Sequence, residues 1–164
     1  MIFLETARLS LRNVKTKDVA VMHDYRNHPA CARYQRGQTK DLAGIQKMVE
    51  DHQADVLTAD KNCLIAVADK VTDELYGEII VMPNEDCFSL GYTFHYAHHR
   101  KGYAFEALSA LIGKLHQEYP SWEFISFTDP ENVPSQKLLL KLGYMDMGYI
   151  EKLDSQMFGK WIKQ

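Results

Sequence analysis

The sequence predicts a mixed α/β (α+β) domain, and two observations carry that prediction. Short apolar segments with a period of two alternate along the chain with longer segments whose apolar residues recur every three or four positions. A length of 164 residues suits one domain, and 46% hydrophobic with 25% charged residues is typical of a globular chain. We therefore expect residues 1–164 to form a single domain whose sheet is flanked by helices.

The first half of the chain predicts three strands and two helices. Residues 8–12 alternate as a first strand, and helices are expected over 17–27 and 41–54. Residues 64–68 and 75–82 read as two strands that form a hairpin around a polar turn.

The second half predicts a strand, a helix, a strand, a helix and a terminal hairpin. Residues 88–94 place Phe88, Leu90, Tyr92 and Phe94 on one face of a strand. The helix that follows carries an apolar stripe at helical spacing, made of Ala104, Ala107, Leu108, Leu111, Ile112, Leu115 and Tyr119. A further strand is expected over residues 124–128.

The loop between residues 99 and 104 has the features of an anion site. Arg100 and Lys101 supply charge, and Gly102 allows a tight turn and a close backbone approach to a ligand. The helix that begins there offers free backbone N–H groups and a partial positive charge. The loop is neither a dinucleotide fingerprint nor a Walker A sequence. It suits a phosphate or a pyrophosphate.

A second motif begins at Asp129, directly after the strand at residues 124–128. Asn132 is placed as an N-cap and Pro134 in the first turn of a helix. Its buried side is expected to consist of Leu138, Leu139 and Leu142, and Gly143 is placed to end the helix in a left-handed conformation.

Together and in this order, the two motifs resemble the GCN5-related N-acetyltransferase (GNAT) superfamily, and in particular its branch of ribosomal-protein N-terminal acetyltransferases. The resemblance extends over nearly the whole chain, through LETARLSLR, ELYGEII, LGYTF, RKGYAFEAL and DPENVPSQKLLLKLGY. It implies a central twisted mixed sheet of six to seven strands with about four helices. It also implies transfer of the acetyl group of acetyl-CoA to an amine.

The resemblance assigns candidate residues to the cofactor. In the family, a loop pattern matched here by His99, Gly102 and Ala104 cradles the pyrophosphate of coenzyme A, and the Asn-x-x-Ser stretch borders the pantetheine arm. The expected cofactor-binding residues are Phe94, His95, His99, Arg100, Lys101, Gly102, Tyr103, Ala104, Asn132 and Ser135.

The catalytic groups are less completely indicated. Many relatives carry a tyrosine seven residues after the asparagine, as proton donor to the departing thiolate, and Leu139 stands there in this chain. Ser135 is the expected substitute, as in the ribosomal-protein branch. The carboxylate that many relatives carry before the Leu/Ile-Gly-Tyr motif is Ser89 here.

Two further roles follow from the chemistry of acetyl transfer. Attack on a thioester creates an oxyanion that a backbone N–H can stabilise, and we expect this donor at Phe94 or His95. For the general base, Glu78 is the first candidate, with Asp154 and Glu151 of the terminal hairpin as rivals.

Composition narrows the remaining possibilities. A net charge of −3 argues against nucleic acid as the main partner, and no apolar run is long enough to cross a membrane. Three cysteines without paired spacing suit free thiols and a cytoplasmic location. His95, His98 and His99 lack the spacing of zinc ligands, so we expect no metal. The protein is expected to be a monomer or a homodimer.

Two other functions remain open at this point. A catalytically silent acyl-CoA-binding or sensor module would also lack the tyrosine and the glutamate, and a nucleotide-binding domain could use the same anion loop. Within the enzyme interpretation, the acceptor is a peptide N-terminus or a small-molecule amine. An α-amino group has a pKa of about 7.7 to 8.0, so it needs only a weak base.

Overall fold

The computed structural model describes residues 1–163, which form one eight-stranded sheet and five α-helices. The strand order is β1-β2-β3-β4-β5-β6-β8-β7. The strands are β1 (Ile2–Glu5), β2 (Leu9–Asn13), β3 (Cys63–Asp69), β4 (Leu75–Pro83), β5 (Cys87–Phe94), β6 (Glu123–Thr128), β7 (Met145–Ile150) and β8 (Ser155–Lys160). The helices are α1 (Asp18–Arg26), α2 (Pro29–Ala32), α3 (Leu42–His52), α4 (Tyr103–Glu118) and α5 (Val133–Lys141).

The mixed fold class is confirmed, with slightly more elements than the sequence indicated. The expected six to seven strands are eight, because β1 pairs with β2 ahead of the first predicted strand. The expected four helices are five, because α2 forms a single turn begun by Pro29 and capped by the ring of His28. Each extra element has only four residues, too few to show a periodic pattern.

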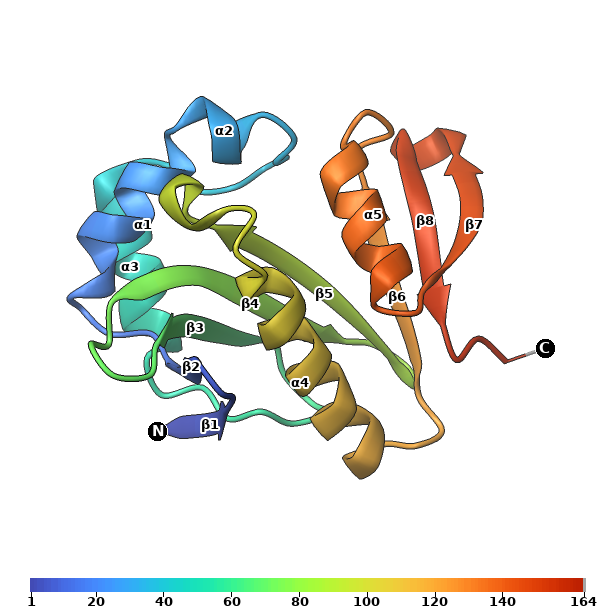
Figure 1. Ribbon diagram of the computed structural model, residues 1–164, viewed down its shortest axis with the longest axis horizontal. Coiled ribbons are helices and arrows are strands. Elements are labelled where there is room, and N and C mark those ends of the chain that lie inside the picture. The colour runs from blue at the N-terminus through green and yellow to red at the C-terminus, as the bar shows by residue number, and fades with distance from the viewer. Residues whose placement is uncertain (164) are drawn as a thin grey trace.

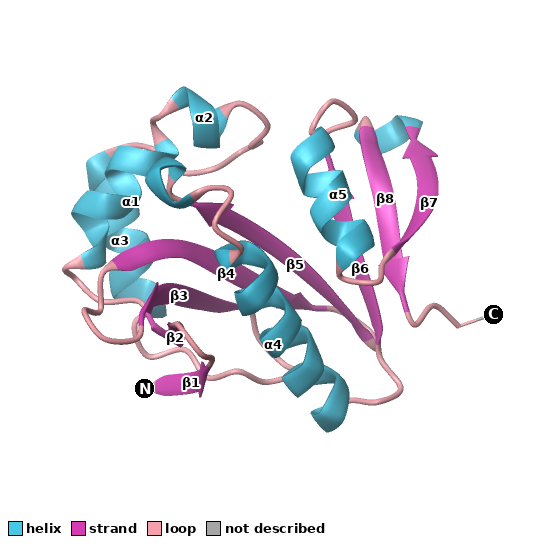
Figure 2. Ribbon diagram, in the orientation of Figure 1, coloured by secondary structure: helices cyan, strands magenta, loops and turns pink. Residues whose placement is uncertain are grey.

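The sheet divides into two parts that share only a short seam. Strands β1 to β5 are antiparallel neighbours. Strands β5 and β6 run parallel, and they pair only at Cys87–Glu123, Phe88–Phe124 and Ser89–Ile125. Beyond Ser89 the two strands diverge, as Figure 2 shows.

Helices cover both faces of the sheet (Figure 1). On one face, α4 packs Ala107, Leu108, Leu111 and Leu115 against the strands, and Leu139 and Leu142 from the end of α5 join the same core. On the other face, α1 and α3 form a second core around Met22, Tyr25 and Ile45. None of the helices in residues 1–163 combines the length and the apolar character that crossing a bilayer requires.

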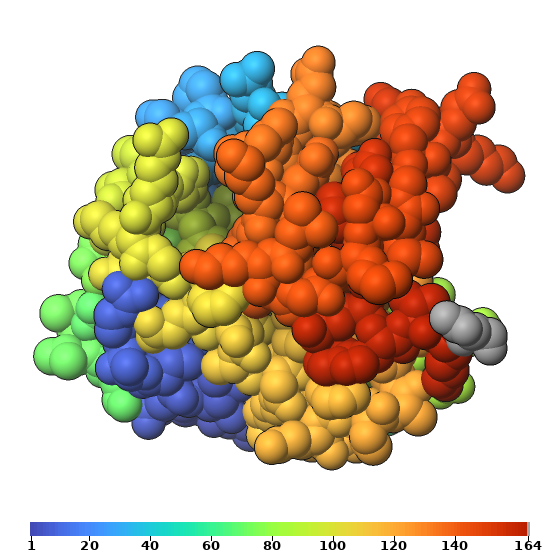
Figure 3. Space-filling view, turned by 45° about the vertical axis from the view of Figure 1, so that its right-hand side comes forward, coloured from blue at the N-terminus to red at the C-terminus, as the bar shows by residue number. Residues whose placement is uncertain are grey.

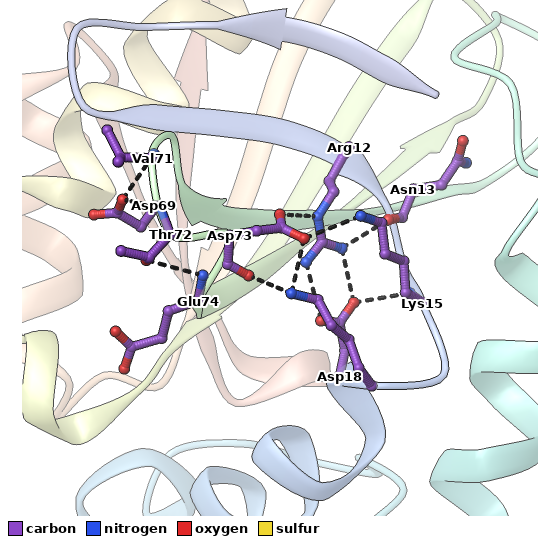
Figure 4. A network of polar contacts seen from close by, with 10 residues as sticks. Arg12, Asn13, Lys15, Asp18, Asp69, Val71, Thr72, Asp73 and Glu74 are labelled. Carbon is purple, nitrogen blue, oxygen red and sulfur yellow. Dashed lines mark hydrogen bonds and ion pairs between the residues drawn. The ribbon is translucent and has the colours of Figure 1, made fainter.

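An ionic network fixes the turn between β3 and β4 against the start of α1 (Figure 4). The guanidinium of Arg12 donates to both oxygens of Asp18, at 2.8 and 3.1 Å, and to Asp73 at 2.7 Å. The Arg12–Asp18 pair is almost fully buried, and Lys15 adds a second cation to Asp73 at 3.0 Å. This network lies away from the divergence of β5 and β6 and has a structural role.

Candidate functional site

A cleft of about 610 Å³ opens where β5 and β6 diverge. Its walls come from the second half of β5, the loop before α4, the first turn of α4, one side of α5, Phe127 of β6, and α2 with the loop that follows it. The space-filling view shows a hollow between the yellow region around residue 100 and the orange surface of α5 (Figure 3).

Most residues predicted to bind the cofactor line this one cleft. They are Phe94, His99, Arg100, Gly102, Tyr103, Ala104, Asn132 and Ser135. Two others do not line it, namely His95 and Lys101. The structure thus brings together two motifs that lie about thirty residues apart in the sequence.

The loop before α4 turns through two left-handed residues. Gly102, the N-cap of α4, has φ +81°, which costs a glycine little. Arg100 has φ +63°, where a side chain costs roughly 1–3 kcal/mol. The resulting turn leaves the first amides of α4 without intrahelical partners at the edge of the cleft. Arg100 therefore contributes a charge at a position where its backbone is strained.

Arg8 supports this loop from outside the cleft, a role that the sequence analysis did not assign. Its guanidinium lies 4.4 Å from the centre of the Tyr103 ring, donates to the Lys101 carbonyl at 3.0 Å, and pairs with Glu106 at 2.7 Å. Only its place in the family-like stretch LETARLSLR drew attention to it, because no local pattern links residue 8 to residue 103.

The backbone of Phe94 faces the opening between the strands. The His95 N–H donates to the Tyr76 carbonyl at 2.8 Å, so His95 is not free to act as the oxyanion donor. Antiparallel pairs alternate in their hydrogen bonding, so the Phe94 N–H points away from β4 toward the cleft. The Phe94 carbonyl accepts from Nε2 of His99 at 2.7 Å. The His99 ring is thus turned toward the strand.

Ser135 lies in the first turn of α5 and faces the cleft. Asn132 caps the helix as predicted, because its side chain accepts from the Ser135 N–H at 3.2 Å. The hydroxyl of Tyr92 lies 2.6 Å from Ser135 Oγ. Burial raises the pKa of Tyr92 to about 12, although the Ser135 contact acts in the opposite direction. Gly143 ends the helix at φ +92°, also as predicted.

Glu78, the first candidate for the general base, lies in a buried ion pair with Arg26. Its side chain is 5% exposed and does not line the cleft. One oxygen accepts from the Tyr25 hydroxyl at 2.7 Å and from Nε of Arg26 at 2.8 Å, and the other accepts from Nη2 of Arg26. Glu78 instead holds α1 against β4, and no local pattern joins it to an arginine 52 positions away.

The rival carboxylates of the terminal hairpin also lie outside the cleft. Asp154 is 71% exposed and accepts from the Tyr149 hydroxyl at 2.7 Å. Arg36, from the loop after α2, donates to the Leu153 and Asp154 carbonyls at 2.9 and 2.8 Å and pairs with Asp129 at 2.9 Å. Glu151 is exposed near the same turn. This turn therefore anchors a loop next to the cleft.

The electrostatic character of the cleft is cationic. Arg100, Lys137 and Lys141 line it, and within residues 1–163 no aspartate or glutamate does. Burial raises the pKa of the Cys31 thiol to about 11, so this cysteine stays protonated. Burial lowers the pKa of His98, which stacks on Tyr76 with ring centres 3.9 Å apart. No three metal-ligating side chains converge anywhere in the described part of the chain.

Comparison with known proteins decides the family. The model of the acetyltransferase (GNAT) domain matches residues 8–145. The chain belongs to the GNAT acetyltransferases. As a GNAT protein it is an acetyltransferase enzyme, and the matched region contains every part of the cleft described above.

Relatives cover nearly the full length of this GNAT chain. An uncharacterised N-acetyltransferase of Bacillus subtilis, YnaD, is 24% identical over 157 residues, which is 91% of this chain and 86% of YnaD. A GNAT-family acetyltransferase structure from Bacillus anthracis has a TM-score of 0.81 at 22% identity, covering 97% of this chain and 96% of that one. A ribosomal L7/L12 α-N-protein acetyltransferase, RimL, solved with coenzyme A, has a TM-score of 0.82 at 13% identity, covering 98% and 97%. These structural likenesses show the shared fold.

In this GNAT enzyme, Leu139 does not reach the cleft. Its side chain is 1% exposed in the core under α5. The hydroxyl that lies beside Ser135 belongs instead to Tyr92, a strand residue that the sequence analysis assigned only to an apolar face. The alternating apolar pattern of the strand predicts only which face Tyr92 lies on. It does not predict which group its hydroxyl contacts.

Proposed function

We propose that this enzyme transfers the acetyl group of acetyl-CoA directly to an amine whose pKa is close to that of an α-amino group, on a peptide N-terminus or a small molecule. The observation that carries the proposal is the composition of the cleft. It combines three cationic side chains with a helix N-terminus, and its described lining contains no carboxylate.

The cleft suits the donor substrate because coenzyme A is a polyanion. The first amides of α4 and the charge of Arg100 favour its pyrophosphate at the loop around Gly102. Lys137 and Lys141 extend the positive charge along α5. The RimL neighbour was solved with coenzyme A, which supports the same donor here.

The reacting groups are assigned from their positions. The amine nitrogen attacks the thioester carbon, and we assign stabilisation of the resulting oxyanion to the Phe94 N–H, because this group is not bonded to β4. The carbon–sulfur bond then breaks and its electron pair stays on sulfur. We assign the hydrogen bond to that thiolate to the Ser135 hydroxyl, since Ser135 lines the cleft.

We infer the pKa class of the acceptor amine from the described lining of the cleft, which contains no carboxylate. An α-amino group, with a pKa of about 7.7 to 8.0, is partly neutral at pH 7, whereas a lysine amine has a pKa about 2.5 units higher and needs a strong base. No carboxylate lines the described cleft to supply that base, and its cations disfavour a second positive charge. The ribosomal-protein acetyltransferases among the structural neighbours support a peptide acceptor.

A pair of peptides tests the acceptor. The two peptides share one sequence apart from the reacting amine. One has a free N-terminus and no lysine, and the other has a blocked N-terminus and a single lysine. We expect thiol release from acetyl-CoA to be faster with the free N-terminus, with a rate that rises through the pKa of the amine. Faster acetylation of the lysine peptide would contradict the acceptor class. Binding of acetyl-CoA without thiol release across a broad amine panel would instead support the sensor module.

A further inference from the structure

Two hydroxyl groups meet inside the cleft. Tyr92 reaches from β5 across the opening toward α5, and its Oη lies 2.6 Å from Ser135 Oγ. The cap from Asn132 fixes the backbone of Ser135. Both side chains line the cleft, in the opening where β5 no longer pairs with β6.

The direction of this hydrogen bond matters, because Ser135 has only one hydroxyl proton. A phenol is a much stronger acid than an aliphatic alcohol and is therefore the better donor of the two. Burial raises the pKa of Tyr92 to about 12, which keeps the phenol protonated at any pH at which the protein works. When Tyr92 donates, Ser135 Oγ accepts, and the serine proton is left to point elsewhere in the cleft.

We propose that Tyr92 is a positioning residue that donates to Ser135 Oγ and thereby directs the Ser135 O–H toward the departing sulfur. This inference rests on the proposed function. As the carbon–sulfur bond breaks, the thiolate accepts the hydrogen bond from Ser135. The proton lost by the acceptor nitrogen balances the proton that the thiolate takes up from solvent, so neither hydroxyl is consumed.

The same geometry explains how the enzyme works with Leu139 at the position where many relatives carry a tyrosine. Leu139 is buried in the core, so α5 presents a serine and no phenol to the cleft. A serine hydroxyl alone can rotate among several directions, whereas one whose oxygen already accepts from a fixed donor has fewer. Tyr92 supplies that donor from the strand.

Single and double variants test the pair. Ser135→Ala should lower kcat roughly 10- to 100-fold, the effect of losing a hydrogen bond to a charged group. Tyr92→Phe should lower kcat roughly 5- to 10-fold, and neither variant should change the KM for acetyl-CoA more than about twofold. The double variant should be no slower than Ser135→Ala alone, because residues that act as a unit are not additive.

Two further variants separate positioning from packing. Tyr144→Phe removes another buried phenol hydroxyl, 3% exposed and outside the cleft, and should leave kcat unchanged. Ser135→Thr keeps the hydroxyl and should recover most of the kcat lost in Ser135→Ala, but only when Tyr92 is present. Circular dichroism and thermal unfolding of each variant check that it folds.

The outcomes distinguish this inference from the proposed function. Additive losses in the double variant, or an unchanged kcat in Tyr92→Phe with chemistry shown to be rate-limiting by single-turnover thiol release, would overturn the positioning role while the acetyl transfer stands. A wild-type protein that releases no thiol with any amine would overturn both.

Discussion

At the scale of the residue, Gly102 constrains the conformation of the loop before α4. Its φ of +81° is accessible to glycine at no steric cost, and a Cβ placed there would lie 3.4 Å from the Arg8 guanidinium. The neighbouring Arg100 already holds a left-handed conformation without being a glycine. The loop therefore has little capacity to take up further backbone strain.

Gly102→Val should abolish measurable binding of acetyl-CoA. A β-branched side chain resists the left-handed conformation, at a cost of about 1–2 kcal/mol, and it also blocks the approach of the backbone to an anion. Gly148→Val is the matched control, because Gly148 has φ +101°, has open space around it and does not line the cleft. Calorimetric titration with acetyl-CoA should show affinity lost in the first variant and retained in the second. Unchanged affinity in a folded Gly102→Val protein would remove the loop from the cofactor site.

At this scale, the sequence predicted residues whose role depends on their neighbours in the chain. The capping of α5 by Asn132 and the left-handed Gly143 are examples, since each is decided within a few residues. The fate of Glu78 could not be predicted, because its partners Tyr25 and Arg26 lie more than 50 positions away. Charge alone does not tell a structural ion pair from a base.

Among the elements, the turn between β3 and β4 shows how charge is used for stability. Asp69 accepts from the N–H groups of Val71 and Thr72, at 2.8 and 2.9 Å, and from the Tyr76 hydroxyl at 2.8 Å. These bonds, led by that from Thr72, lower the pKa of Asp69 to about 2. The folded state thus holds this carboxylate in its charged form more strongly than the unfolded state does.

The pH dependence follows from that sign. Asp69 has a pKa of about 3.9 in the unfolded chain and a lower pKa in the folded protein, so at pH values between the two the unfolded chain binds more protons. The stabilisation from Asp69 is therefore present above pH 4 and is lost as the pH falls toward 2. Urea unfolding should show wild type more stable than Asp69→Asn at pH 6, with the difference narrowing by pH 2.5. Asp60→Asn, which alters an exposed aspartate, serves as the control. A difference that stays constant with pH would contradict the role of the Asp69 charge.

The elements themselves were largely predictable. The predicted helix at 41–54 is α3 at Leu42–His52, and the predicted strand at 88–94 is β5 at Cys87–Phe94. Long periodic segments carry their own signal, whereas β1 and α2 are each four residues long. Strand β1 depends on pairing with β2, and α2 on a proline and the cap from His28.

For the molecule as a whole, Arg36 connects the loop after α2 to the β7–β8 turn. This contact lies across the cleft from the short β5–β6 pairing. Its guanidinium bonds the β7–β8 turn and Asp129, and its neighbours Tyr34 and Gln35 line the cleft. No sequence pattern could reveal this link, because it spans 93 to 118 positions.

Arg36→Ala should weaken acceptor binding more than donor binding. Losing the guanidinium's hydrogen bonds to the β7–β8 turn and to Asp129 frees the segment that carries Tyr34 and Gln35. We expect the acceptor KM to rise roughly 3- to 10-fold while the acetyl-CoA affinity changes little. Lys40→Ala removes one positive charge from an exposed position of the same loop and should leave the acceptor KM near the wild-type value. Equal increases in both variants would attribute the effect to charge alone.

The short pairing of β5 with β6 divides the sheet into two parts, β1–β5 and β6–β8, that open away from each other. Three residue pairs connect the parts at one end, Tyr92 contacts Ser135 across the opening, and Arg36 pairs with Asp129 beyond it. One hydrophobic core contains residues of both parts, such as Phe94 from β5 and Phe158 from β8, so the two parts pack as one unit. The Arg36–Asp129 contact lies outside the cleft, so a substitution at Arg36 offers a way to alter the width of the opening while leaving its chemical groups in place.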